Sequence, residues 1–334
     1  MAGPLPVGQK WPSDNLLKQL DDATKTFHAY VHVPYCTVRC GYCDFNTYTQ
    51  QEIAPVAMAQ FHKPLIKEIG FSRGVLSQSG YSSPLSSVFF GGGTPSLFSP
   101  IQIASILDAL KMNFGFDDAC EITLEANPES ATEEFLEGIR AAGVNRLSIG
   151  SQSFDSDVLR ILDRQHEIEK VSEVVRKAKE LGFRTSIDLI YGAPGESLES
   201  WKRTVEKALE LKTEHISAYS LIVEEGTKLA RQIKRGELDD VDEDLNAEKY
   251  EYATQRFEEA GLEWYEVSNF GEASAHNIAY WQSQNWWGYG PGAHSHIAGN
   301  RFWNHKHPAK YVELNEIGSP AAGIEELTQR QMLE

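Results

Sequence analysis

Cysteine is scarce in this chain, with four residues among 334. Because cysteines are few and no apolar signal segment opens the sequence, we expect no disulfide framework and a reducing, cytoplasmic setting. No uninterrupted run of about eighteen apolar residues occurs, so the sequence predicts no membrane-spanning helix. Basic residues are outnumbered 48 to 31 by acidic ones, which gives a net charge of −17. This balance disfavours a nucleic-acid-binding protein, which needs a basic face.

Three of the four cysteines lie close together, in the segment His32-Val-Pro-Tyr-Cys36-Thr-Val-Arg-Cys40-Gly-Tyr-Cys43-Asp-Phe. Three thiolates can hold three irons of a [4Fe-4S] cluster, which leaves the fourth iron open to a small molecule. S-adenosylmethionine (SAM) would chelate that open iron through its amino and carboxylate groups. The spacing C-x3-C-x2-C therefore predicts that Cys36, Cys40 and Cys43 are the ligands of such a cluster.

A zinc site is the alternative interpretation of the same cysteines. Together with His32 they would form a Cys3His site, and the chain would then be a zinc-stabilised structural or interaction protein. Zinc sites usually pair two short ligand clusters that are far apart in sequence, and no second cluster of that form follows. Buried thiols without a metal are a further alternative. Cys120 precedes an apolar strand pattern, and we expect it to be a small buried side chain.

Strand and helix patterns alternate along the first two thirds of the chain. The expected strands are Tyr30–Val33, Ser87–Phe90, Glu121–Glu125, Arg146–Gly150, Arg184–Tyr191 and His215–Leu221. The expected helices are Ile53–Ile69, Pro100–Leu110, Ala131–Ala142, Ser156–Leu181 with a break near Gln165, and Leu198–Leu211. This alternation predicts an α/β fold with a parallel sheet. Because candidate site residues follow several successive strands, a partial barrel is favoured over a doubly wound sheet.

The composition divides the chain into three parts. Residues 1–26 are polar and rich in proline, and we expect a loosely docked arm. Residues 27–222 would form the partial barrel. Residues 223–334 would form a mixed α+β extension with charged helices, strand-like content near Glu263–Phe270 and an aromatic-rich segment. Ile324–Glu334 has a helical pattern without a stop signal, as expected of a chain that continues further.

Polar and glycine residues at the expected strand ends are candidates for a SAM site. Gly91-Gly-Gly-Thr-Pro95 lets a ligand approach the backbone closely and is placed to hold the SAM ammonium group, although a tight turn is the simpler interpretation. Carboxylates such as Glu125 and Asp188 can accept hydrogen bonds from ribose hydroxyls or an ammonium group. Arg164 can form a forked pair with the SAM carboxylate, and Gln152 is placed to complete the site. Taken singly, each is equally explained as a surface or capping residue.

Several motifs together resemble the radical SAM superfamily, in its coproporphyrinogen-dehydrogenase-like branch. They occur in the family's order between about residues 28 and 308: Tyr30–Cys36 with Cys40 and Cys43, Gly91–Ser96, Leu124–Pro128, Asn145–Phe154 and Ile187–Gly192. The resemblance implies a partial (β/α)6 barrel that holds a [4Fe-4S] cluster and SAM. It implies that the SAM contacts are Tyr30, Gly93, Thr94, Glu125, Gln152, Arg164 and Asp188.

Two groups within this branch differ in function. The oxygen-independent coproporphyrinogen III dehydrogenases cleave SAM and abstract hydrogen from propionate side chains, and their motif continues as Cys-Gly-Cys. Here Cys43 is followed by Asp44 and Phe45, which puts that activity in doubt. The segment His276-Asn-Ile-Ala-Tyr280-Trp281 instead matches the H-N-x-x-Y-W motif of the heme-chaperone group. The resemblance therefore implies a heme chaperone that transfers heme to an acceptor protein, which allows peripheral membrane association through that acceptor.

The residue types of this last segment suit heme. Imidazole is a common axial ligand of heme iron, and a helix would place His276 and Tyr280 on one face. The aromatic side chains available to stack on a porphyrin are Tyr280, Trp281, Trp286, Trp287 and Tyr289. The alternative is that these aromatics form a packed lid over the barrel, with His276 as a hydrogen-bonded structural residue. The sequence leaves both interpretations open.

Overall fold

The computed structural model describes residues 5–17, 25–53, 57–164, 166–328 and 331. Within this part of the chain, twelve strands form one continuous sheet and two short strands form a second. The parallel run of the large sheet contains β1 (Phe27–Val33), β4 (Leu85–Gly92), β5 (Phe116–Ala126), β6 (Arg146–Gln152), β7 (Arg184–Tyr191) and β8 (His215–Ser220). The others are β9 (Trp264–Glu266), β10 (Asn269–Gly271), β11 (Asn285–Tyr289), β12 (His294–Ile297), β13 (Asn300–Asn304), β14 (Ala321–Glu326), and the pair β2 (Tyr35–Cys36) and β3 (Tyr48–Thr49).

The order of the parallel strands decides between the two expected architectures. Strands β1, β4, β5, β6, β7 and β8 are neighbours in the order in which the chain makes them. A doubly wound sheet reverses its strand order at a switch point, whereas a barrel adds strands in one direction. All six expected strands and the partial barrel are therefore confirmed, and the sheet stays open between β1 and β8.

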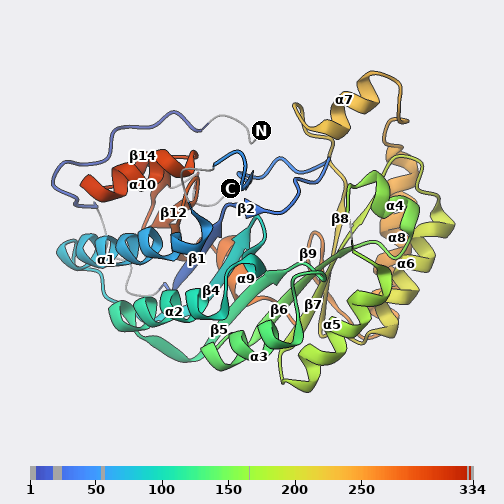
Figure 1. Cartoon of the computed structure of the whole chain (residues 1–334), viewed down its shortest axis with the longest axis horizontal. Helices are drawn as coiled ribbons and strands as arrows, with labels where there is room; N and C mark the ends of the chain where they lie inside the picture. Colours follow the sequence, from blue (N-terminus) through green and yellow to red (C-terminus); the bar gives the residue numbers. More distant parts are fainter. Residues whose placement is uncertain (1–4, 18–24, 54–56, 165, 329–330, 332–334) are drawn as a thin grey trace.

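Helices connect the parallel strands and cover the outer face of the curved sheet, where Figure 1 shows α1, α2, α3 and α5 side by side. The helices are α1 (His62–Gln78), α2 (Pro100–Phe114), α3 (Glu133–Ala142), α4 (Ser156–Ile161), α5 (Ile168–Glu180), α6 (Leu198–Glu210), α7 (Lys228–Lys234), α8 (Glu243–Glu259), α9 (Ala275–Trp281) and α10 (Pro308–Ile317), with 3-10 turns at Met58–Gln60 and Pro95–Leu97. Local sequence sets their ends. Ser99 forms a capping box with Gln102 at the start of α2, and Gly143 ends α3 in the left-handed conformation (φ 107°).

Two helix predictions differ from the structure. The helix expected at Ile53–Ile69 begins at His62, so that Pro64 falls in its first turn, where a missing N–H costs nothing. The helix expected at Ile324–Glu334 is wrong over its first residues, because Ile324 belongs to β14 and pairs with Phe302 of β13. Burial of Ile324 in this pairing overrides the local helical pattern. Residues 329–330 and 332–334 lie outside the described part, as does Gln165 at the expected break between α4 and α5.

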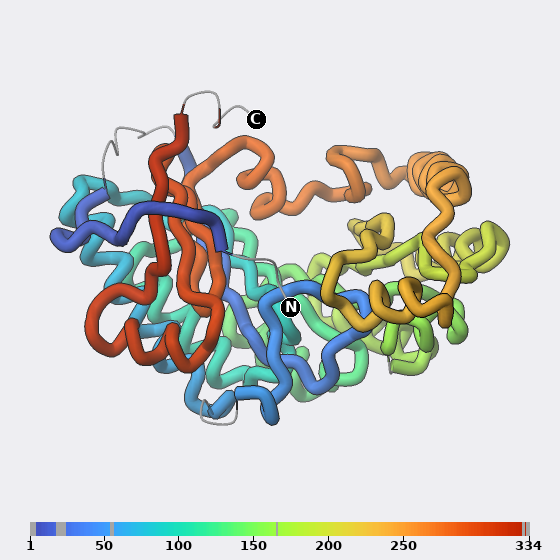
Figure 2. Tube along the Cα trace, turned by 90° about the horizontal axis from the view of Figure 1, so that it is seen from above, coloured from blue at the N-terminus to red at the C-terminus, as the bar shows by residue number. Residues whose placement is uncertain are grey.

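The extension after residue 222 continues the same sheet. Strand β11 pairs in parallel with β1 at one edge of the barrel, and β10 pairs antiparallel with β8 at the other. The segment between them carries α9 across the open side of the curved sheet, and Figure 2 shows it as an orange tube bridging the two ends. The extension therefore closes the side that the six barrel strands leave open.

The described part of the N-terminal arm is anchored to this extension. Gln9 forms a β-bridge with Ile324, and the Trp11 ring lies 5.2 Å from the Phe302 ring and 6.1 Å from the Phe71 ring. Across the described residues, no helix combines the length and the apolar character that crossing a bilayer requires.

A buried carboxylate fastens α1 to the extension. Glu68 accepts hydrogen bonds from the Tyr311 hydroxyl (2.6 Å), the Asn304 amide (2.7 Å), the Gly290 backbone N–H (2.9 Å) and the Trp287 indole N–H (3.5 Å). These donors come from α10, β13 and the end of β11, which Glu68 thereby holds in one arrangement. Burial raises the pKa of Glu68 to about 7, and the four donors limit the rise.

Glu68→Ala should lower the free energy of unfolding by roughly 2–4 kcal/mol, because it leaves several buried donors without an acceptor. The wild-type carboxyl holds its proton more tightly in the folded state than in the unfolded chain, where its pKa is about 4.5. Its stabilising contribution is therefore full below pH 4.5 and is lost as the pH rises through about 7. Chemical denaturation of wild type and Glu68→Gln across this range tests the point, and identical pH profiles for the two would contradict it.

Candidate functional site

One cavity of about 500 Å³ collects nearly all the residues that the sequence singled out. It lies on the inner side of the curved sheet, between the barrel strands and α9. Its lining includes Tyr30, Cys36, Cys40, Cys43, Gly93, Thr94, Glu125, Gln152, Arg164, Asp188, His276 and Tyr280. Trp281 lies outside the lining, and its side chain is 59% exposed. The SAM and heme candidates thus face a single chamber.

The cysteine loop leaves β1 and forms one wall of this cavity. The Thr94 hydroxyl points at the Cys36 sulfur (3.8 Å), and Arg164 Nη1 points at the Cys40 sulfur (3.8 Å). Burial raises the pKa of the Cys36 thiol to about 11 and also raises that of Cys43. Such thiols keep their protons until iron displaces them, while the neighbouring donors stabilise the thiolates that result. Three thiols with hydrogen-bond donors suit the three ligated corners of a [4Fe-4S] cluster.

The alternative zinc site is not favoured by this geometry. His32 Nε2 bonds to the Asn46 carbonyl oxygen (2.9 Å), and its Nδ1 bonds to the Tyr30 hydroxyl (3.1 Å). Because a carbonyl oxygen only accepts, His32 Nε2 carries the ring proton and Nδ1 accepts from the Tyr30 hydroxyl. Within the described ranges, no three His, Cys, Asp or Glu side chains lie close enough to share a single metal ion. Cys120 is buried, as expected of a small core side chain.

The glycine run at the end of β4 is required by close packing against β1. A Cβ on Gly93 would lie 2.5 Å from the Tyr35 carbonyl oxygen and 2.9 Å from that of Val33. Gly92 has φ 109°, and a Cβ there would lie 2.5 Å from the His32 ring. The run is thus more than a tight turn, because it lays the end of β4 directly against the start of the cysteine loop.

Two buried carboxyl groups face the cavity from β5 and β7. Glu125 accepts a hydrogen bond from the Gly92 backbone N–H (3.2 Å), and both carboxylate oxygens of Asp188 accept from the Ser148 hydroxyl (3.0 Å each). Burial raises the pKa of Glu125 to about 8, with a contribution from the charge of Asp188, and burial also raises the pKa of Asp188. A pair of like-charged buried groups favours a ligand that brings a positive charge or hydrogen-bond donors.

Gln152 ends β6 beside this pair, and Arg164 links the ends of β5 and β6. Gln152 adopts φ 65°, an uncommon conformation for a residue other than glycine. Arg164 Nη2 donates to Asn127 Oδ1 and to the Gly150 carbonyl oxygen, both at 2.8 Å. Arg164 Nε is buried and has no hydrogen-bond partner in the described chain. The arginine fork expected for a carboxylate is therefore partly occupied, and Nε is the donor left for a ligand.

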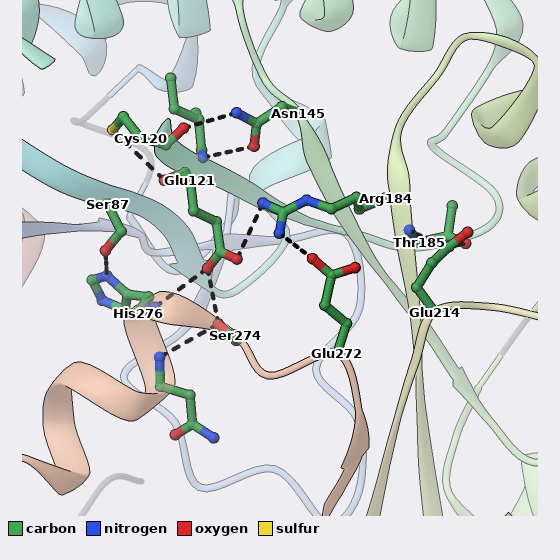
Figure 3. A network of polar contacts seen from close by, with 12 residues as sticks. Ser87, Cys120, Glu121, Asn145, Arg184, Thr185, Glu214, Glu272, Ser274 and His276 are labelled. Atoms are coloured by element: carbon green, nitrogen blue, oxygen red, sulfur yellow. Dashed lines mark hydrogen bonds and ion pairs between the residues drawn. The ribbon is translucent and has the colours of Figure 1, made fainter. Parts of the chain in front are cut away.

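His276 is buried at the start of α9, and both of its ring nitrogens are hydrogen-bonded; Figure 3 shows the bond to Ser87. Its Nδ1 lies 2.7 Å from the Ser87 hydroxyl, and its Nε2 lies 2.9 Å from the Tyr280 hydroxyl. The Ser87 hydroxyl also meets His28 Nδ1 at 2.8 Å. Burial lowers the pKa of His276 well below its usual value, so the imidazole is neutral. His28 of β1, Ser87 of β4 and His276 thus form a continuous chain of hydrogen bonds that ends at the cavity.

A second set of hydrogen bonds fixes the start of α9 to β5, on the inner face of the barrel sheet. Glu121 accepts from the Ser274 hydroxyl (3.0 Å), the His276 backbone N–H (3.3 Å) and Arg184 (3.3 Å), as Figure 3 shows. Arg184 also pairs with Glu272 at 2.7 Å. Sequence reasoning missed Ser87, Glu121 and Arg184. The signal that could have found them is the alternation of side chains along a strand, which places these polar residues on the inner face of otherwise apolar strands.

The aromatic residues near α9 divide into two groups. The Tyr280 ring lies 4.7 Å from the Trp286 ring, on the side of the sheet that bears the cavity. Trp287 and Tyr289 are fully buried in the core, where Trp287 packs 4.8 Å from Phe302. The expectation that Trp287 and Tyr289 stack on a porphyrin is therefore not supported. The packed-core alternative describes these two residues.

Comparisons with known proteins identify the family of this chain. A family model described as the radical SAM superfamily matches residues 30–208. The chain is 42% identical to the heme chaperone HemW of Mycobacterium tuberculosis, over 90% of this chain and 77% of the relative. The chain belongs to the radical SAM superfamily, within the HemW family. It is also 36% identical to the heme chaperone HemW of Bacillus subtilis, over 92% of this chain and 80% of that one.

A solved structure supports the same assignment of the fold. The coproporphyrinogen III oxidase HemN of Escherichia coli matches with a TM-score of 0.78 at 26% identity, over 91% of this chain and 72% of that one. As a radical SAM protein the chain uses a [4Fe-4S] cluster and SAM. The three thiols, the free Arg164 Nε and the paired carboxyl groups fit that pair of cofactors. The bound cluster supplies an iron site at which SAM chelates.

The affinity for SAM should rise with pH in the range where Glu125 ionises. At neutral pH this carboxyl is largely protonated, because its pKa is about 8, and an ammonium or hydroxyl donor of SAM is bound best by the ionised form. Calorimetry of cluster-loaded protein between about pH 7 and pH 9 would measure this increase, together with proton release near neutral pH. Glu125→Gln, which cannot ionise, is the matched control. An equal pH dependence in both proteins would remove Glu125 from the SAM site.

Proposed function

We propose that the chain is a heme chaperone that binds heme beside its SAM-ligated [4Fe-4S] cluster and transfers the heme to an acceptor protein. The observation that carries the proposal is that His276, from the H-N-x-x-Y-W segment, lines the same cavity as the three cysteines. The relatives from M. tuberculosis and B. subtilis, which match over most of their length, are named as heme chaperones.

His276 is the residue best suited to hold the heme iron. Burial keeps its imidazole neutral, so a nitrogen lone pair is available without loss of a proton. The Ser87 hydroxyl at Nδ1 would orient the ring, as second-layer partners of ligating histidines commonly do. Coordination at Nε2 would require the Tyr280 hydroxyl to release its bond, and Tyr280 is 36% exposed, which gives it room to turn. Trp281, exposed on the same helix, would then lie beside the porphyrin.

Coproporphyrinogen III dehydrogenation is the second candidate, and the similarity to HemN is what favours it. Two residues argue against it. Asp44 and Phe45 stand where that group continues as Gly-Cys after the third cysteine, and the Phe45 side chain is 65% exposed. We further propose a cytoplasmic protein that associates with a membrane through its acceptor, since a net charge of −17 disfavours direct binding to an anionic membrane surface.

Heme titration tests the role of His276. Wild type should give a saturable Soret change, whereas His276→Ala should lose at least about tenfold in affinity, because it removes the axial ligand. His294→Ala is a matched control that removes an exposed histidine stacked on Trp303, and it should bind as wild type does. Because the pKa of His276 lies well below 6.5, the wild-type spectrum should persist as the pH falls through 6.5. Equal titrations of wild type and His276→Ala would remove His276 as the ligand.

A second experiment separates the chaperone from the dehydrogenase. Protein purified without oxygen and loaded with its cluster is mixed with coproporphyrinogen III, SAM and reductant, and the porphyrins are analysed by chromatography. The proposal predicts no more protoporphyrinogen than a Cys36→Ala protein forms, since that variant lacks one cluster ligand. Turnover in wild type that disappears in Cys36→Ala would establish the enzyme instead.

A further inference from the structure

Arg146, the first residue of β6, is a buried cation that forms no close ion pair with any described residue. Its side chain is 4% exposed, yet it lines the cavity. Within the described part of the chain its guanidinium forms no hydrogen bond and no ion pair. Arg184, its register partner on β7, pairs with both Glu121 and Glu272. Because the donors of Arg146 line the cavity without a protein acceptor, they can bind a ligand there.

Most of the groups that line the cavity beside Arg146 are uncharged. Those that line the same end of the cavity are neutral, namely Ser217, Tyr265, Asn269 and Asn277. His215 is also neutral, because burial and the nearby Arg146 charge both lower its pKa well below the usual value. The charge of Asp188 interacts with that of Arg146, but the two side chains do not form a hydrogen bond or a close ion pair in the described chain.

The acidic residues of this region already have hydrogen-bond partners. Glu266 accepts from the side-chain amides of Asn269 and Asn277. Asp188 binds the Ser148 hydroxyl through both of its oxygens. Glu121 is held by Arg184 and the Ser274 hydroxyl. None of these carboxyl groups forms a close ion pair with Arg146 in the described chain, so its guanidinium donors remain available to a ligand in the cavity.

Arg146 is also remote from the groups that face the cluster. Arg164 bonds to the Gly150 carbonyl oxygen, four residues further along β6, which corresponds to roughly 13 Å of extended strand. A ligand group at Arg146 is therefore separate from one that meets Arg164 beside the cysteine loop. Both arginines nevertheless interact electrostatically with Asp188 of β7.

We propose that Arg146 is the centre of a carboxylate-binding subsite in this cavity. A planar guanidinium fork matches a carboxylate with two parallel hydrogen bonds. The carboxylate would come from a propionate of the tetrapyrrole, an assignment that rests on the proposed function, or from the carboxylate of SAM. The distance from the cysteine loop favours the propionate.

The experiment compares heme with its dimethyl ester, which has the same ring and iron but no free carboxylate. Wild type should bind heme about 10- to 100-fold more tightly than the ester, the range expected for a buried charge-assisted pair. Arg146→Gln should bind both forms with the weaker affinity, so that the preference disappears. Arg146→Lys keeps the charge without the fork and should retain part of the preference. Arg176→Gln, which removes an exposed arginine of α5 paired with Glu180, should behave as wild type does.

A parallel titration with SAM identifies the source of the carboxylate. If Arg146→Gln weakens SAM at least tenfold and leaves the heme preference unchanged, the subsite belongs to SAM. This result would also uphold the subsite if wild type bound no heme, in which case only the proposed function fails. Unchanged heme preference together with unchanged SAM affinity in Arg146→Gln overturns the subsite. Iron content and circular dichroism establish that the variants are folded, and the comparison of heme with its ester in wild type needs no variant.

Discussion

Polar side chains on the inner face of the parallel sheet impose the constraint on which the rest of this structure depends. A buried parallel sheet normally presents apolar side chains to what covers it, because each buried polar group needs a partner. Here the inner face carries three hydrogen-bonding groups that the barrel strands alone leave incomplete. Ser87 meets His276, Glu121 meets Ser274, and His215 meets Tyr265 at 3.0 Å. Each bond joins a barrel strand to the segment that follows α8.

The segment that follows α8 is therefore joined to the barrel by strand pairing and by side-chain hydrogen bonds. It pairs with β8 through β10 and with β1 through β11, and its polar residues complete the inner face between these edges. Those bonds fix the start of α9 and carry His276 into the chamber that the cysteine loop also faces. The hydrogen bonds that complete the inner face of the sheet therefore also bring His276, the candidate heme ligand, to the cavity that the cysteine loop lines.

The sequence predicted the parts of this protein that depend on local pattern. The six strands, the partial barrel and the cysteine motif follow from alternation and spacing, and the structure reproduces the strands in their expected order. Contacts between distant segments were not predictable. Neither Ser87 nor Glu121 belongs to a motif, and their roles depend on the path of the chain some 190 and 150 residues later. Ile324 was misassigned for the same reason, since its strand exists only through pairing with β13.

The central claim is that heme and the cluster occupy one chamber, with His276 and the three cysteines as the respective ligands. Crystals of cluster-loaded protein soaked anaerobically with heme, measured at the iron absorption edge, test it most directly. We predict one anomalous peak at Cys36, Cys40 and Cys43 and a second peak at His276 on the cavity side of α9. A heme iron peak outside this cavity, at an exposed residue such as His294, would contradict the account.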